Sequence, residues 1–378
     1  MKIILAFDSF KNCMTSPEIC RIFRQQVMEY VPDFEVVSMP LGDGGEGTAR
    51  AVADACGGVM HDFEVTGPLQ KKVSAHWGEL PDGSAVFEMA SASGIELISE
   101  SERDPMKTTT YGTGELLRHI ISDCGIRKVT IGIGGSATVD GGVGMLQALG
   151  VKFFDNSGVE LPVPADGTDI SRIRSIDVSG LADEVKESRI LIASDVTNPL
   201  CGESGAARVF APQKGADQRT VEFLEKSLEN LGRVCVESGL ADNFSSPGDG
   251  AAGGVGFALR AILGAESRSG AELVLDQLKF DDALENADAV ITGEGCSDSQ
   301  TLCGKLPAAV SERAGKKGVP VILLSGALGK DSKALEEKFS CVFTLSSGAV
   351  SLQEALDSAP QNLVRMAKAI VNLLQISR

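Results

Sequence analysis

Short apolar runs alternate with amphipathic stretches in the first part of the chain. Residues 2–7 form an apolar run that predicts a buried strand, and residues 15–30 follow it with a helical pattern. That helix opens with a hydroxyl cap, a proline in the first turn and an early glutamate. A second strand is predicted over residues 34–41 and a second helix over residues 48–56. Alternating strands and helices with short connections predict a parallel sheet flanked by helices.

The pattern then changes to extended segments separated by turn residues, at 59–66, 72–78 and 84–90. Further strands and helices are predicted beyond them, with the strands at 127–133 and 189–194 and the helices at 112–123, 142–150 and 218–239.

The last part of the chain returns to the opening pattern. It predicts strands at 288–292, 319–324 and 341–345, and a closing amphipathic helix at 360–375. We therefore predict an α/β fold in which a Rossmann-like parallel-sheet domain is formed by both termini, residues 1–66 and 286–378. A second α/β domain is inserted over residues 67–285, and the active site is expected in the cleft between the two.

The charge and glycine content of the chain indicate which classes of ligand it can bind. The net charge is −17, which argues against nucleic acid because such binders carry a basic footprint. Glycine is abundant, with 43 residues clustered rather than periodic, and this predicts many tight loops that approach a ligand. A small anionic substrate would need lysines, backbone N–H groups or a metal ion to overcome the acidic field.

The nine cysteines show no C-x-x-C pair, and the three histidines lie in no ligand spacing. The N-terminal apolar run is too short for a signal peptide, and no stretch is long enough to cross a membrane. We expect a reduced cytoplasmic protein with no membrane partner. Its oligomeric state stays open, a homo-oligomer included.

Carboxylates follow several of the predicted strands. Asp8 ends the first strand, Asp43 and Glu46 follow the second, and Glu294 and Asp298 follow a late one. Parallel strands would bring Asp8, Asp43 and Glu294 to one edge of the sheet. Such a cluster is costly unless a cation or raised pKa values relieve it, and Mg²⁺ commonly does so together with substrate phosphates.

A glycine-rich loop in the inserted domain predicts an anion site. Gly134, Gly135, Ser136 and Thr138 follow a strand and precede a helix, so free N–H groups and two hydroxyls are available to a phosphate or carboxylate. Three lysines in glycine-rich loops are candidate phosphate partners, namely Lys11, Lys214 and Lys305.

The segment Gly42–Gly47 also matches a dinucleotide-binding fingerprint after a strand. Its two acidic residues would oppose a pyrophosphate there, so a nicotinamide-dependent oxidoreductase remains an alternative with little support.

Several ordered motifs resemble one family, the bacterial glycerate kinases of the two-domain type. The motifs are DSFK at 8–11, PLGDGGEGT at 40–48, EMASASG at 88–94, YGTGEL at 111–116, GIGGSATVDGGVGMLQALG at 132–150, DVTNPL at 195–200, APQKGA at 211–216 and TGEGCSDSQTLCGKLP at 292–307. The chain departs from the family pattern at Asn12, Val139, Ala211 and Asp249.

The resemblance implies ATP- and Mg²⁺-dependent phosphorylation of D-glycerate, with 2-phosphoglycerate as the usual product. On the matching positions, Asp43, Glu46, Glu294 and Asp298 become metal candidates. Asp195 is the first choice as the general base and Asp8 the second, while Lys11 would neutralise developing charge.

Substrate and phosphate contacts are expected from a further set: Ser9, Gly134, Gly135, Ser136, Thr138, Asn198, Lys214 and Lys305. Phosphorylation of the other hydroxyl to give 3-phosphoglycerate, and a non-catalytic sensor that binds glycerate, remain alternatives.

Overall fold

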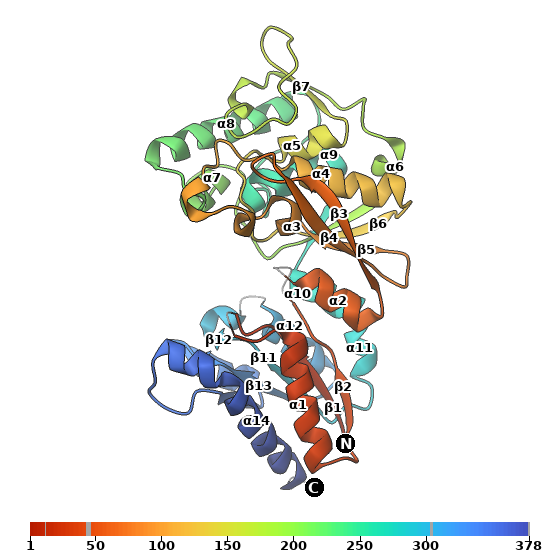
Figure 1. The fold of residues 1–378 in the computed structure, drawn as a ribbon, viewed down its shortest axis with the longest axis vertical. Coiled ribbons are helices and arrows are strands. Elements are labelled where there is room, and N and C mark those ends of the chain that lie inside the picture. The colour runs from red at the N-terminus through yellow and green to blue at the C-terminus, as the bar shows by residue number, and fades with distance from the viewer. Residues whose placement is uncertain (12, 43–46, 303–304, 377–378) are drawn as a thin grey trace. The chain divides into compact units, whose positions relative to one another are not determined.

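Strands from both ends of the chain form one five-stranded sheet in the order β15-β13-β11-β1-β2 (Figure 1). The computed structural model describes residues 1–11, 13–42, 47–302 and 305–376. All pairings in this sheet are parallel, as the alternation of strands and helices predicts. The strands are β1 (Lys2–Phe7), β2 (Glu35–Ser38), β11 (Ala289–Gly293), β13 (Val321–Ser325) and β15 (Cys341–Thr344).

Helices cover this sheet because alternate strand residues point to opposite faces. Ile3, Leu5 and Phe7 pack in one core with apolar residues of α1 and α14, and these two helices contact each other (Figure 1). Another helix, α12, packs against β11 and β13. The helices of this part are α1 (Ser16–Tyr30), α10 (Gly270–Gln277), α11 (Phe280–Ala283), α12 (Leu306–Lys316), α13 (Leu335–Lys338) and α14 (Leu352–Ile376); the short pair β12 (Cys296–Ser297) and β14 (Ala327–Leu328) lies beyond the strand ends.

The last helix begins at Leu352, earlier than the predicted start at residue 360, and it contains Pro360. Proline has no N–H and would leave the carbonyl four residues earlier, that of Leu356, without its helical donor. The Cys13 thiol donates a hydrogen bond to that carbonyl oxygen, with 3.5 Å between the two atoms. The predicted start at residue 360 was therefore too late, since the helix continues through the proline and the thiol supplies a donor to the Leu356 carbonyl.

A second sheet has six strands in the order β10-β9-β6-β5-β4-β3. The pairings from β10 to β5 are parallel, while β4 is antiparallel to both β5 and β3. Its strands are β3 (Val59–Thr66), β4 (Lys72–Glu79), β5 (Ala85–Glu88), β6 (Lys128–Gly132), β9 (Arg189–Ala193) and β10 (Glu266–Arg268).

The helices around the second sheet enclose a large apolar core. They are α3 (Ala90–Ser93), α4 (Tyr111–Arg118), α5 (Val143–Ala148), α6 (Asp183–Lys186), α7 (Ala206–Phe210), α8 (Gln218–Glu237) and α9 (Val255–Leu263); a small antiparallel pair, β7 (Lys152–Phe154) and β8 (Ser175–Asp177), lies outside the main sheet. The helix α2 (Thr48–Cys56) does not contribute to this core. The fold class is thus mixed α/β with parallel sheets, as the sequence predicts.

Contacts divide the chain into two units whose bounds differ from the predicted ones. The first unit comprises the described residues of Met1–Asp43, Asp54–Cys56 and Ser269–Arg378, and the second those of Gly44–Ala53 and Gly57–Arg268. Strand β3 falls in the second unit because it pairs along its whole length with β4. Residues 269–285 fall in the first unit because α10 packs against α12.

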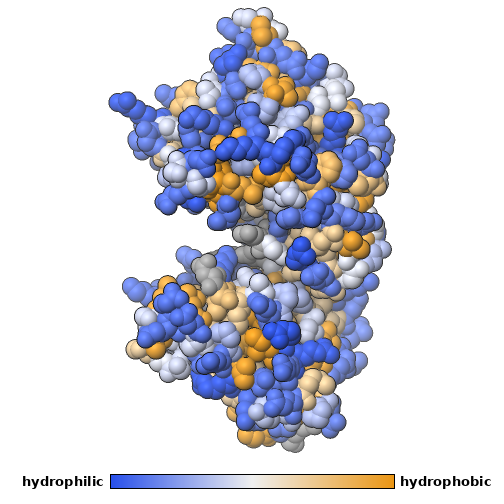
Figure 2. Space-filling view, viewed as in Figure 1, coloured by the Kyte–Doolittle hydropathy of each residue, from blue (hydrophilic) through white to orange (hydrophobic). Residues whose placement is uncertain are grey.

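Hydrophilic side chains dominate the visible face of each unit, and apolar residues are scattered among them (Figure 2). Within the described part of the chain, no helix combines the length and the hydropathy required to span a bilayer.

Candidate active site

Two carboxylates stand at neighbouring strand ends in the first unit. Asp8 follows β1 and Glu294 follows β11, and these strands are paired in parallel. The register continues past the strands, since the Asp8 backbone N–H donates to the Gly293 carbonyl at 2.9 Å. Asp8 and Glu294 therefore lie at the same edge of the sheet, as the parallel order predicts.

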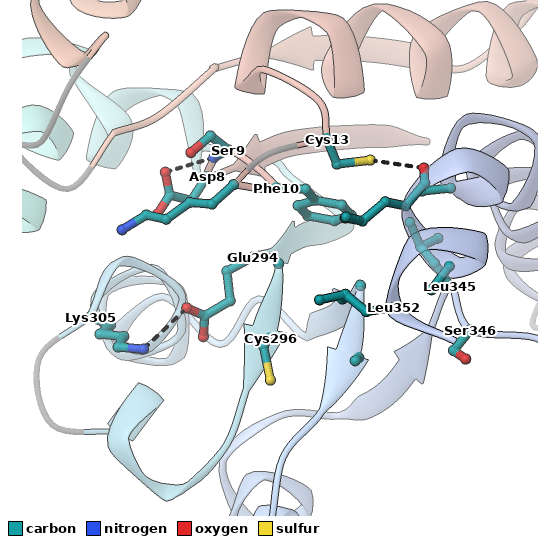
Figure 3. Close-up of a pocket in the computed structure, with 17 residues that line it drawn as sticks. Asp8, Ser9, Phe10, Cys13, Glu294, Cys296, Lys305, Leu345, Ser346 and Leu352 are labelled. Atoms are coloured by element: carbon teal, nitrogen blue, oxygen red, sulfur yellow. Dashed lines mark hydrogen bonds and ion pairs between the residues drawn. The ribbon is translucent and has the colours of Figure 1, made fainter. Parts of the chain in front are cut away.

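A pocket of about 360 Å³ opens at this edge. Among the described residues, the charged ones that line it are Asp8, Lys11, Glu294 and Lys305. Ser9 lines it too, and Figure 3 shows it beside Asp8. The Asp8 carboxylate accepts a hydrogen bond from the Ser9 backbone N–H at 2.7 Å, which orients it at the end of the strand. The structure thus brings five of the predicted site residues together in one pocket.

Glu294 is held in place by hydroxyl groups. Its Oε1 accepts hydrogen bonds from Ser297 Oγ at 3.0 Å and Thr301 Oγ1 at 2.6 Å. Its Oε2 lies 3.5 Å from Lys305 Nζ, whose side chain is 45% exposed. Oε1 of this buried carboxylate therefore accepts two hydrogen bonds from protein hydroxyls, whereas Oε2 has, among the described residues, only a long ion pair with the half-exposed Lys305 side chain. A carboxylate oxygen of this kind fits a Mg²⁺ ion, which takes one or two carboxylates along with phosphate oxygens.

Of the remaining predicted metal candidates, Asp298 is described by the structure and does not line this pocket. Asp298 Oδ1 accepts from the Gln300 backbone N–H at 2.8 Å, and the Asp298 backbone N–H donates to Thr301 Oγ1 at 3.0 Å. These bonds build the turn that presents Thr301 to Glu294. Asp43 and Glu46 lie outside the described residues.

A second pocket, of about 340 Å³, lies at strand ends in the other unit. Gly134, Gly135 and Ser136 reach it from the loop after β6, and Ser194 and Val196 from the loop after the parallel neighbour β9. Among the described lining residues, Lys214 is the only charged one.

Three further predicted residues lie beside this second pocket rather than in its lining. Asp195 is exposed and sits between the lining residues Ser194 and Val196. The Asn198 amide Nδ2 donates to the Ser204 carbonyl at 2.8 Å and shapes the loop after β9. Thr138 is fully buried, and its Oγ1 has no hydrogen-bond partner among the described residues.

Lys214 is almost completely buried, with 2% of its surface exposed. Its Nζ donates to Ser136 Oγ at 2.7 Å and to the Thr138 carbonyl at 2.6 Å. Burial disfavours the ammonium form and lowers the pKa of Lys214 to about 7, although Asp140 opposes the shift. The next residue, Gly215, has a φ of 97°, and a Cβ there would lie 2.2 Å from the Arg103 carbonyl oxygen. Only glycine fits this turn, so the direction of Lys214 is fixed by the backbone.

Asp140 holds the glycine-rich loop together, and it is not among the candidate residues predicted from the sequence. Its carboxylate accepts hydrogen bonds from Thr110 N–H at 2.8 Å, Thr110 Oγ1 at 2.7 Å, Gly142 N–H at 3.1 Å and Gly144 N–H at 3.3 Å. Complete burial raises the pKa of Asp140, and these donors oppose the rise. The carboxylate ties the glycine loop and the start of α5 to Thr110. Its place between the Ser-Ala-Thr segment and two glycines is the signal that could have identified it.

Comparisons with known proteins agree over the whole chain. A sequence model of the glycerate kinase family matches residues 3–375. The chain is 42% identical to the glycerate 2-kinase of Escherichia coli (strain K12), with 100% of this chain and 98% of that protein covered. It is 40% identical to the glycerate kinase of Bacillus subtilis (strain 168), with 100% and 99% covered.

The chain is similar in fold to the crystal structure of a protein from Salmonella typhimurium LT2. That protein carries the provisional name glycerate kinase 2. Its TM-score is 0.89 at 41% identity, and the alignment covers 100% of this chain and 99% of that one.

Proposed function

The chain belongs to the glycerate kinase family, a family of phosphotransferases, and we propose that it transfers the terminal phosphoryl group of ATP to D-glycerate, giving 2-phosphoglycerate and ADP. The observation that carries the proposal is the difference in charge between the two pockets. Among the described residues, one pocket is lined by two lysines and two carboxylates, whereas the other has Lys214 as its only charged residue.

The first pocket matches a metal polyphosphate. Bound Mg²⁺ would neutralise charge on the phosphate oxygens and stabilise the charge of the transition state. Glu294 Oε2 would hold the ion, and Lys11 and Lys305 would bind phosphate oxygens directly. The hydroxyls of Ser297 and Thr301 keep the Glu294 carboxylate oriented for this task.

The second pocket matches a small monoanion. In the ammonium form Lys214 carries one positive charge, and the loop of Gly134, Gly135 and Ser136 offers a hydroxyl and backbone N–H groups. This combination suits the carboxylate of glycerate. Asp195, exposed beside this pocket, is our proposed acceptor of the proton of the attacking hydroxyl, with Asp8 as the second choice.

A ³¹P NMR time course with ATP, Mg²⁺ and D-glycerate tests the function. We expect ADP and a phosphomonoester whose phosphorus couples to a single proton, as in the 2-phosphate. Coupling to two protons would identify the 3-phosphate instead. Unchanged ATP, in a sample where omission of glycerate and addition of EDTA serve as blanks, would refute the kinase assignment.

A further inference from the structure

The pocket of the first unit changes character along its length. It follows the carboxyl ends of β1, β11, β13 and β15, which are consecutive in the sheet. The charged residues come from the β1 and β11 ends and the start of α12. The β15 end and α14 contribute an apolar wall, whose residues are Leu345, Leu352, Ala355, Leu356 and Ala359. Figure 3 shows Asp8, Glu294 and Lys305 on one side of the pocket and Leu345 and Leu352 on the other.

Apart from Leu345, the residues of the apolar wall form a regular stripe on one helix. Leu352, Ala355, Leu356 and Ala359 recur at intervals of three and four residues, so they share one face of α14. Leu352 is 77% exposed at the rim, while Leu345 is buried behind the stripe at 2%. A leucine this exposed beside a concave surface gains most from a ligand that covers it.

The wall is anchored to the loop that carries the charged groups. The Cys13 thiol bonds the Leu356 carbonyl that Pro360 leaves free, and Phe10 from the same loop lines the pocket between the two ends. Phe10 is itself 3% exposed and stacks edge-on against Phe7, with 6.4 Å between the ring centroids. The apolar wall and the charged end are therefore parts of one packed assembly within this unit.

We infer that the apolar stripe of α14 binds the nucleobase of ATP, and that the triphosphate extends along the strand ends to Lys11, Lys305 and Glu294. The inference rests on the proposed kinase function and adds which part of the chain recognises the nucleoside. A nucleotide is apolar and flat at one end and multiply charged at the other, and this pocket has the same polarity in the same order. Ligand pockets of about 300–1,000 Å³ with apolar walls and few polar groups are typical of such sites, and this one measures about 360 Å³.

Calorimetric titration in the presence of Mg²⁺ separates the base from the phosphates. ADP reports on both ends of the pocket, and inorganic tripolyphosphate reports on the charged end alone. The test variants are Leu352→Asp, which places a charge on the stripe, and Ala355→Trp, which fills the space beside it. We expect each to weaken ADP binding about tenfold or more, because the first replaces an apolar contact by a charge and the second occupies the space of the base, and to change tripolyphosphate binding less than about twofold.

The same helix offers matched controls. Leu373 and Ala369 are exposed on α14 and do not line the pocket, so Leu373→Asp and Ala369→Trp make the same chemical changes elsewhere. Both should bind ADP like the wild type. Normal ADP binding by Leu352→Asp and Ala355→Trp would overturn the inference and place the base elsewhere. A wild-type chain that binds neither ADP nor tripolyphosphate would instead refute the proposed function itself.

Discussion

Lys214 Nζ lies 2.7 Å from Ser136 Oγ, although 78 residues separate them in the chain. The second bond, to the Thr138 carbonyl, leaves the ammonium one N–H to offer a ligand. A cation buried to this degree, and tied to a glycine-rich loop, is placed for a single anionic group.

Replacing this cation should weaken glycerate binding with little loss of fold. Lys214→Met keeps the length of the side chain and removes a desolvated charge, which offsets the two lost hydrogen bonds. We expect KM for glycerate to rise about 10- to 100-fold, since a hydrogen bond to a charged group is worth about 1.5–3 kcal/mol. Lys226→Met, at an exposed position on α8, is the control and should leave KM unchanged. Equal KM values in the two variants would contradict the role of Lys214.

The lowered pKa of Lys214 predicts that glycerate binding takes up a proton. Above its folded value of about 7 the free amine is mostly neutral, and a bound carboxylate favours the ammonium form. At pH 8, titrations in two buffers of different ionisation enthalpy should show uptake approaching one proton in the wild type and none in Lys214→Met. Uptake that persists in the variant would assign the proton to another group.

Folding stability should respond to the same group. Between about pH 7 and the ordinary lysine value of 10.5, the unfolded chain binds more protons at this residue than the folded protein does. The contribution of Lys214 to the free energy of unfolding therefore increases as the pH rises through this window. Urea denaturation at pH 7 and pH 9 measures the free energy of unfolding at each pH. The change in this free energy from pH 7 to pH 9 should be more positive for the wild type than for Lys214→Met.

Asp140 should be essential for the stability of the second unit. All four of its bonds come from donors, three to Oδ2 and one to Oδ1, so the amide of Asp140→Asn must place its NH₂ against an N–H group. We expect the free energy of unfolding to fall by about 1–3 kcal/mol, the cost of unsatisfied buried polar groups. Urea denaturation measures it, with the exposed Asp183→Asn as the control. A loss equal to that of the control would mean that the loop does not depend on Asp140.

Glu294→Gln should act mainly on the metal requirement. Glutamine keeps an oxygen for the Ser297 and Thr301 hydroxyls but loses the charge opposite Lys305. We expect the Mg²⁺ concentration for half-maximal rate to rise about tenfold or more, as for the loss of one charge-assisted contact. The exposed Glu337→Gln is the matched variant. An unchanged Mg²⁺ dependence in Glu294→Gln would exclude this carboxylate from the metal site.

Asp195→Asn tests the choice of general base. Loss of a general base typically lowers kcat by about 10²–10⁴. The KM for glycerate should change little, because the substrate carboxylate is assigned to Lys214. Asp8→Asn is measured beside it, since Asp8 is the second choice. Near-normal turnover of Asp195→Asn with a large loss in Asp8→Asn would move the role to Asp8.

Local patterns were sufficient to predict most elements and the carboxylates at their ends. Buried strands appear as short apolar runs, so Asp8 and Glu294 could be placed at strand ends. A parallel arrangement of these strands then predicts that the two carboxylates lie at the same edge of the sheet, as they do. The pairing partner of each strand was harder to predict from the sequence. Residues 59–66 were correctly predicted as extended, yet alternation of side chains cannot say which strand they join, and their partner β4 sets the unit to which they belong.

Contacts between distant residues could not be predicted from spacing. The pairing of Lys214 with Ser136 depends on how a short helical turn packs under the glycine loop. The donor that Pro360 withholds from the Leu356 carbonyl is replaced by a thiol that lies 343 residues away in the chain. Sequence patterns record what a residue prefers locally, whereas these contacts depend on the packing of the completed fold.

The central position of β1 between β2 and β11 sets an order for folding during synthesis. The ribosome makes β1 and β2 before the other strands of this sheet, but a pair of parallel strands is not stable alone, and β11, β13 and β15 emerge only after β3 to β10. The strands β3 to β10 lie between them in the chain and can form their sheet in the meantime. At translation speeds of about 5–20 residues per second, the nascent apolar strand β1 waits for its partners for tens of seconds. Strand β1 is therefore synthesised well before it can become native, and it needs shielding from aggregation until then.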